Sequence, residues 1–72
     1  MKISYDKEID ALSITFKEAT VTTKHIAEGI AVDYDSEGVV AGIEILDVKK
    51  RLGGNDTFKQ VVLEGVGLEL AA

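Results

Sequence analysis

Apolar residues recur with period two in two segments between Ile26 and Leu46, and the rest of the chain is organised around this stretch. Such alternation is typical of a strand with one buried face. Two alternating segments flank an acidic turn at 35–38, so we predict a β-hairpin in which Gly38 takes a positive φ at no steric cost. Gly29 and Gly42 each favour a bulge or a close backbone approach. One face of the second strand is expected to carry Val39, Ala41, Ile43 and Ile45.

Two further strands are predicted before the hairpin. Apolar residues alternate with polar ones over 1–5, and after an acidic turn at 6–10 the alternation resumes over 12–16. Residues 18–24 are rich in threonine and are compatible with either an edge strand or an extended link into the hairpin. Because the connections are short, we predict four antiparallel strands in a meander.

The period changes after Leu46. Asp47 is a good N-cap, three cations at 49–51 suit a last helical turn, and two glycines follow, so we predict a short helix over Val48–Leu52. Beyond it, Thr57 and Gln60 fit a capping box for a helix that reaches Gly65. The tail also contains a strand-like alternation of Val66, Leu68 and Leu70.

The expected fold class is therefore α+β. It consists of a small antiparallel four-stranded meander sheet with one or two short C-terminal helices, and the alternation at 66–70 leaves a fifth strand open. We find no repeat and no linker, and we predict a single domain over residues 1–72.

The chain has 72 residues and no cysteine, which limits the core. A domain of this size buries only about 60% of the surface that its unfolded chain exposes. Without cysteine, neither a disulfide nor a thiolate metal site can supplement that core, so self-association is the expected source of further stability.

The formal net charge is −5, with acids spread along the whole chain. Such a field repels phosphate backbones, and 6% aromatic residues are too few for a base-stacking platform, so we predict no nucleic-acid partner. No apolar run approaches the roughly 20 residues that span a bilayer, and no charged-then-apolar leader is seen. We therefore expect no membrane partner and a cytoplasmic location.

Short motifs in the first two thirds of the chain resemble a known family. They are Tyr5-Asp6, Asp10-Ala11-Leu12, Gly29-Ile30, Asp33-Tyr34-Asp35, Gly38 and the run Gly42-Ile43-Glu44-Ile45-Leu46-Asp47. The chain resembles the small prokaryotic family called domain of unknown function 2283, from Met1 to about Leu52. Two departures are Lys7 and Glu28, where the family pattern often has proline. The resemblance implies a compact β-rich cytoplasmic protein with no assigned activity, and some members look like partners of small neighbouring proteins in operons of toxin–antitoxin character.

The acidic residues of the central hairpin reproduce the spacing of a twelve-residue EF-hand loop, with the sixth-position glycine at Gly38 and the last ligand at Glu44. The earlier ligands would be Asp33, Asp35 and Glu37. An EF-hand needs helices on both sides, whereas the flanking segments have strand periodicity. We therefore interpret these residues as a solvent-facing turn and predict no metal ligand.

A second acidic cluster, Asp6, Glu8 and Asp10, could act as a metal or acid–base site. Such clusters more often cap a turn and keep a sheet edge soluble, and we adopt that interpretation. The sequence does not say whether the two acidic turns converge.

His25 is the only histidine, which excludes a two-histidine metal site within one chain. A nucleophilic site would have to combine it with Ser4, Ser13 or Ser36, none of which lies in a G-x-S-x-G motif. We predict that His25 is a partly exposed residue at a strand end. We predict no catalytic residue.

The one basic run, Lys49-Lys50-Arg51, suits a helix C-terminus, with docking to an acidic partner as the alternative. The glycines in Gly65-Val66-Gly67 do not form a phosphate-binding loop, because no G-x-G-x-x-G is present and no Lys-Ser/Thr follows them. No cofactor is predicted.

The apolar residues exceed what one face of a small sheet needs to bury, and surplus apolar surface usually marks association. The surplus comprises Val40, Leu46, Val61, Leu63, Leu68 and Leu70. We therefore predict a non-enzymatic interaction protein, a homodimer that binds another small protein. The alternatives are small-ligand or calcium binding through the acidic turns, and an enzyme that uses clustered carboxylates.

Overall fold

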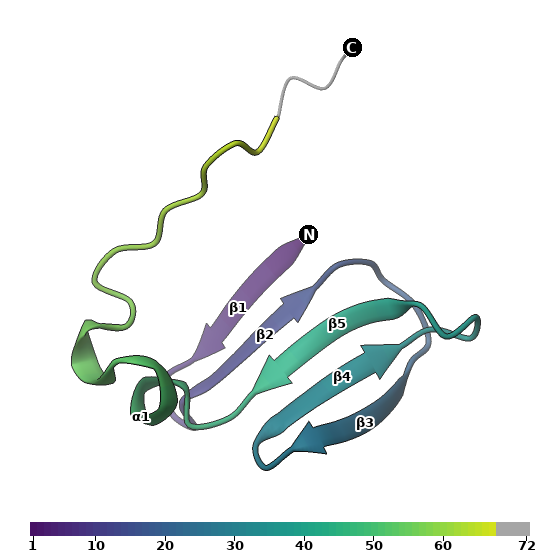
Figure 1. The fold of residues 1–72 in the computed structure, drawn as a ribbon, viewed down its shortest axis with the longest axis horizontal. Helices are drawn as coiled ribbons and strands as arrows, with labels where there is room; N and C mark the ends of the chain where they lie inside the picture. The colour runs from purple at the N-terminus through teal and green to yellow at the C-terminus, as the bar shows by residue number, and fades with distance from the viewer. Residues whose placement is uncertain (68–72) are drawn as a thin grey trace.

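The computed structural model describes residues 1–67, which form one antiparallel sheet followed by a short helix (Figure 1). The strands are β1 (Lys2–Asp6), β2 (Ala11–Thr15), β3 (Thr22–Ala27), β4 (Ile30–Tyr34) and β5 (Val40–Ile45). Helix α1 (Val48–Leu52) and the 3-10 turn η1 (Gly54–Asp56) come next. The fold is β-rich, and its sheet has five strands rather than the predicted four.

The strands lie in the order β1-β2-β5-β4-β3, and every neighbouring pair is antiparallel. The predicted meander is therefore wrong, because β2 pairs with β5 and the chain crosses to the far edge before β3 begins. Strands β3, β4 and β5 form a meander with β2 beside β5, which is a Greek-key arrangement. In the threonine-rich segment 18–24, residues 18–21 form the link and residues 22–24 begin the edge strand β3.

The predicted hairpin between β4 and β5 is confirmed. The N–H of Gly38 donates to the carbonyl of Asp35 at 3.0 Å, and Gly38 has φ 81°. The predicted bulge is also present, because Asp33 pairs with Gly42 while Tyr34 pairs with Val40. One extra residue on β5 therefore brings Val40 onto the same face as Ile43. The sequence pattern had assigned Val40 to the opposite face.

Gly29 and Gly42 both lie where another chain segment approaches closely. Gly29 closes the β3–β4 turn with φ 75°, and a Cβ atom there would overlap the guanidinium of Arg51. A Cβ atom on Gly42 would lie 2.9 Å from the carbonyl oxygen of Ile14. The prediction of close backbone approach is therefore confirmed at Gly42, whereas the close neighbour of Gly29 is a side chain.

Helix α1 has the predicted bounds, but its N-terminus is capped differently from the prediction. Asp47 is left-handed, with φ 53°, and makes no side-chain cap hydrogen bond. The N–H of Lys49 instead donates to the carboxylate of Asp10 at 3.1 and 3.2 Å, and the N–H of Val48 donates to the Asp10 carbonyl at 3.1 Å. The β1–β2 turn thus supplies the cap from a distant part of the sequence.

The helix predicted from Thr57 to Gly65 does not form. The hydroxyl of Thr57 donates back to the carbonyl of Gly54 at 2.8 Å, and residues 60–67 have no regular secondary structure. The alternating Leu68 and Leu70 lie outside the described residues. In Figure 1 the helix lies beyond the end of the sheet and the tail lies beside β1. The ring of Phe58 contacts Tyr5, with centroids 4.4 Å apart.

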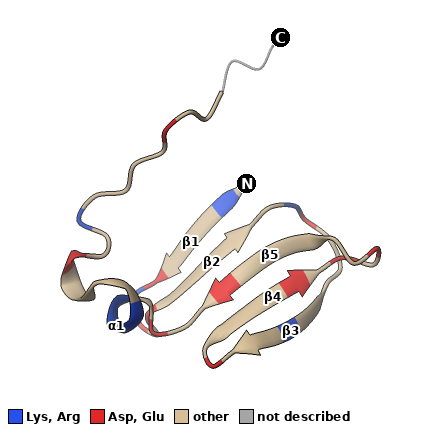
Figure 2. Cartoon of the chain, viewed as in Figure 1, with Lys and Arg blue, Asp and Glu red and all other residues tan. Residues whose placement is uncertain are grey.

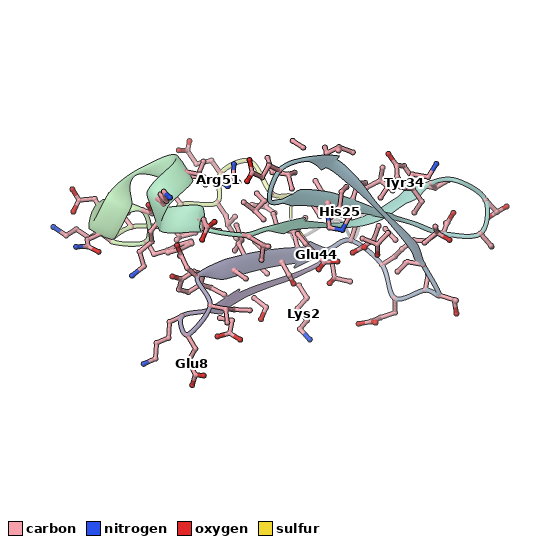
Figure 3. All side chains as sticks on the ribbon, turned by 90° about the horizontal axis from the view of Figure 1, so that it is seen from below. Lys2, Glu8, His25, Tyr34, Glu44 and Arg51 are labelled. Atoms are coloured by element: carbon pink, nitrogen blue, oxygen red, sulfur yellow. The ribbon has the colours of Figure 1, made fainter. Side chains whose placement is uncertain are left out.

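The strand pairings divide the sheet into an apolar face and a polar face, since directly paired residues point to the same side. The apolar face consists of Ile3, Tyr5, Leu12, Ile14, Ile30, Val32, Tyr34, Val40, Ile43 and Ile45, with Lys24 and Thr22 at the β3 edge. The polar face carries Lys2, Ser4, Asp6, Ser13, Thr15, Thr23, His25, Asp33 and Glu44, with the small residues Ala11, Ala31 and Gly42 among them. Figure 3 accordingly shows Lys2 and Glu44 on the opposite side of the sheet from Tyr34.

The core of this single layer is small. The buried hydrophobic residues are Ala31, Val32, Ala41 and Val48. Val48 is completely buried at the junction between α1 and the β1–β2 turn. Within residues 1–67, no helix is long and apolar enough to cross a lipid bilayer.

Candidate functional site

Asp35, the central residue of the EF-hand-like spacing, is used by the hairpin turn itself. Its side chain is almost fully buried, and one carboxylate oxygen accepts the N–H groups of Glu37 and Val39, both at 2.9 Å. The other oxygen forms an ion pair with Lys17, which holds the pKa of Asp35 below its usual value. Glu44 lies within β5, away from this turn. The predicted solvent-facing turn is thus partly wrong, since its first carboxylate points inward.

The acidic cluster at 6–10 closes the β1–β2 connection. Asp6 accepts the N–H of Glu8 at 2.9 Å, while the carboxylate of Asp10 accepts the hydroxyl of Tyr5 at 2.7 Å as well as the N–H of Lys49. The hydrogen bond between Tyr5 and Asp10 raises the pKa of Tyr5 to about 12 and lowers that of Asp10. The interpretation of these acids as turn residues is confirmed, and the helix cap at Asp10 is an additional role.

The two acidic turns lie at opposite ends of the sheet. The β1–β2 turn follows Asp6 at the end where β5 finishes at Ile45, whereas the β4–β5 turn precedes Val40 at the other end. The turns therefore do not form a shared site. Among residues 1–67, no three His, Cys, Asp or Glu side chains are close enough together to hold a metal ion.

His25 lies on the exposed edge strand β3, on the polar face. Ser13 belongs to the same cross-strand row, but β5 and β4 lie between them. Three strand spacings of about 4.8 Å separate the two positions by roughly 14 Å. Ser4 lies one strand farther away on β1. This separation is far beyond the hydrogen-bond distance that a serine nucleophile and its histidine base require.

The polar face also holds a carboxyl pair that sequence reasoning missed. The side-chain hydrogen bond between Asp33 and Glu44 raises the pKa of Glu44, and Thr23 donates its hydroxyl to Asp33 at 2.5 Å. The two acids are diagonal neighbours, because Asp33 pairs with Gly42 and Glu44 pairs with Ala31. The sequence signal for this is that both acids fall on the same face of the hairpin by alternation. The adjoining pocket, lined by His25, Gly29, Ala31, Glu44 and Leu46, has about 150 Å³. Sites for small molecules usually occupy about 300–1,000 Å³.

The basic run on α1 contributes to the junction between the helix and the sheet. The Nε–H of Arg51 donates to the carbonyl of Leu46 at 2.9 Å, and its guanidinium lies over Gly29. Figure 2 shows the cluster of positive charge on α1 at one end of the molecule, beside the ends of β1 and β5. The predicted position of the three cations in the last helical turn is confirmed.

The apolar face is the most extensive feature without a covering element. Ile3 is 50% exposed, Val40 is 40% exposed, and Phe16, which directly follows β2, is 42% exposed. The tail adds further exposed apolar residues, namely Val61, Val62, Leu63 and Val66. Monomeric proteins rarely leave large contiguous apolar patches open, so this face is the candidate functional site.

Comparison with known families gives one match. The family described as "Protein of unknown function (DUF2283)" matches residues 2–49, which is two thirds of the chain. The chain belongs to this family. No curated protein and no solved structure matches the chain.

In this DUF2283 protein the matched region includes all five strands and the start of α1. Both sheet faces, the Asp10 cap and the Asp33–Glu44 pair thus belong to the part described by the family. Residues 50–67, with the exposed apolar tail, lie beyond the match. The resemblance predicted from the sequence is confirmed, and the family description assigns no activity to any residue.

Proposed function

We propose that this DUF2283 protein is a non-enzymatic interaction module that binds protein through the apolar face of its sheet. The observation that carries the proposal is the uncovered apolar face. It extends over β2, β5 and β4, while α1 lies beyond the end of the sheet (Figure 1). The tail meets this face only at β1, where Phe58 contacts Tyr5 and Leu63 and Val66 line a pocket with Ile3.

A sheet with one apolar face needs a second layer. Stable domains bury that face against another sheet or against helices, and each Å² of apolar surface removed from water contributes about 25 cal/mol. The described chain supplies only the five-residue helix α1, placed at the end of the sheet. Another polypeptide is therefore the natural source of the missing layer.

The residues that would serve the alternative functions have structural partners instead. Asp35 and Asp10 are held by backbone N–H groups, and His25 is roughly 14 Å from Ser13. These contacts favour binding over chemistry. A predicted small protein partner, such as the product of a neighbouring gene, would use the same apolar face, and a cytoplasmic location would suit such a partner.

The test compares substitutions of two adjacent residues on opposite faces of β2. Ile14 lies on the apolar face and Ser13 on the polar face, so Ile14→Lys and Ser13→Lys add the same charge to different surfaces. Each tagged variant is isolated from the native host after crosslinking, and its bound protein is quantified by mass spectrometry. We expect Ser13→Lys to retain the wild-type partner, including an untagged copy, and Ile14→Lys to lose it. Equal retention by all three forms would overturn the proposal.

A further inference from the structure

We propose that the occupant of the apolar face is a second copy of this chain, stacked sheet against sheet about a two-fold axis near Ile43. This inference rests on the proposed function and names its partner. The resulting dimer is a two-layer β-sandwich, in which the polar faces point outward and the apolar faces meet at a sheet spacing of about 10 Å.

Charge selects the apolar face for self-association. Each copy carries a formal net charge of −5, so two copies repel one another wherever their acids meet. None of the strand residues on the apolar face is acidic, and its one charged residue, Lys24, lies on the edge strand β3. The polar face, in contrast, carries Asp6, Asp33 and Glu44. Identical chains can therefore stack through the apolar face without opposing carboxylates.

The size of the face suits a small dimer. Five strands about 4.8 Å apart, each of five or six residues that rise about 3.3 Å, give a flat footprint on the order of 400 Å². Specific interfaces bury about 800 Å² of accessible surface per partner, and interfaces below that value are weaker. The accessible surface of this face is larger than its flat footprint, because side chains protrude from the sheet and Phe16 and Val40 are exposed. We therefore expect a dimer whose population depends on protein concentration.

The requirement of the fold for a second layer also favours a copy over a different protein. The described core is limited to four buried hydrophobic residues, so a cover over the apolar face adds substantially to the buried apolar surface. A second copy is always present in the required ratio. Most soluble oligomers are homo-oligomers with two-fold symmetry, in which one patch contacts itself.

The position of Ile43 makes it the residue nearest the two-fold axis. It lies on β5, the middle strand, and pairs with Ile14 on β2 and with Val32 on β4. In a face-to-face dimer centred on the sheet, Ile43 of one copy therefore opposes Ile43 of the other. Glu44, the next residue, points away from the partner on the outer face.

The experiment uses the absence of native cysteine to place single thiols on the two faces. Ile43→Cys and Glu44→Cys are prepared as full-length chains and treated with a bismaleimide whose reach is about the 10 Å sheet spacing. We expect Ile43→Cys to form a covalent dimer in high yield on a denaturing gel, and Glu44→Cys to give at least tenfold less. Equal yields, or a higher yield from Glu44→Cys, would overturn the inference.

Sedimentation velocity provides an independent measurement. The wild-type chain of 7.7 kDa should sediment at twice that mass, whereas Ile43→Asp should sediment as a folded monomer or unfold. If Ile43→Asp unfolds, the crosslinking yields alone decide which face of the sheet associates, and for this reason both measurements are made. A wild-type monomer at all concentrations, with no Ile43→Cys crosslink, overturns the dimer. If Ile14→Lys still loses another protein in that case, the interaction function survives the loss of the dimer.

Discussion

Val48 anchors the helix to the sheet, and replacing it with alanine tests that role. Its side chain is 0% exposed, at the first position of α1 and next to the Asp10 cap. Val48→Ala removes two buried methyl groups at about 0.8 kcal/mol each and leaves a cavity, so the expected loss is about 2 kcal/mol. At about 0.05–0.15 kcal/mol per residue, the 72-residue chain has a total stability of about 4–11 kcal/mol.

The assay is thermal unfolding followed by circular dichroism. For a domain of this size, 1 kcal/mol corresponds to about 4–8 °C, so Val48→Ala should lower the Tm by about 8–16 °C. Leu52→Ala is the matched control, because Leu52 lies in the same helix but is 60% exposed, and its loss should stay within about 0.5 kcal/mol. All samples need the same protein concentration, since self-association makes the Tm concentration-dependent.

Equal small changes in Tm for the two variants would refute the reasoning, because they would mean that α1 is not held to the sheet by burial of Val48. The sheet itself should keep its association, since α1 lies beyond the end of the apolar face (Figure 1). We therefore expect Val48→Ala to sediment at the wild-type mass, because the junction at α1 and the apolar face of the sheet are different parts of the molecule.

Three further predictions follow from backbone conformation and titration. Gly29→Ala should destabilise more than Gly38→Ala. Both positions have positive φ, which costs about 1–2 kcal/mol for alanine, but at Gly29 the new Cβ atom also displaces the guanidinium of Arg51 and so breaks its hydrogen bond to Leu46. Equal urea midpoints would contradict this. The pKa of Tyr5 rises from 10.0 to about 12 on folding, so the free energy of unfolding should fall as pH rises from 10 to 12. Tyr5→Phe should flatten this pH dependence when the free energy is measured by urea unfolding. An unchanged dependence on pH would show that the hydroxyl does not matter. The pKa of Glu44 is raised in the folded protein, so this carboxyl contributes stability at pH values below its ordinary pKa of 4.5 and loses that contribution as pH rises. Glu44→Gln should therefore gain stability relative to wild type as pH rises from 4 to 7. A difference in free energy of unfolding that does not change with pH would argue against the carboxyl pair.

Local features were predictable from the sequence because their causes lie within a few residues. The turn before Gly38 needs a positive φ, and glycine provides it without strain. The helix Val48–Leu52 ends at a pair of glycines, and its bounds follow from that composition. The sequence rule for the N-cap failed, however, because Asp10 reaches Lys49 from 39 residues away and makes a cap at Asp47 unnecessary.

The neighbours of each strand were not predictable from the sequence. Alternation identifies a strand, but the pairing of β2 with β5 depends on a crossover over residues 16–21. The threonine-rich composition that begins there is compatible with either an edge strand or an extended link. The strand β3 contains Thr22, Thr23, Lys24 and His25, and it lacks the apolar alternation that marks the other strands. As an edge strand it has little to bury, so its sequence carries a weak signal.

The apolar face nevertheless follows from the sequence, even though the strand order does not. Period-two alternation assigns a residue to a face without reference to the neighbouring strand, and pairing in any order joins residues of the same face. Ile14, Val32 and Ile43 therefore share a face in the meander as well as in the observed Greek key. The bulge at Ala41 is the exception, because one extra residue brings Val40 onto that face. An association surface defined by alternation is thus more robust to topology than a site that requires two distant turns to meet.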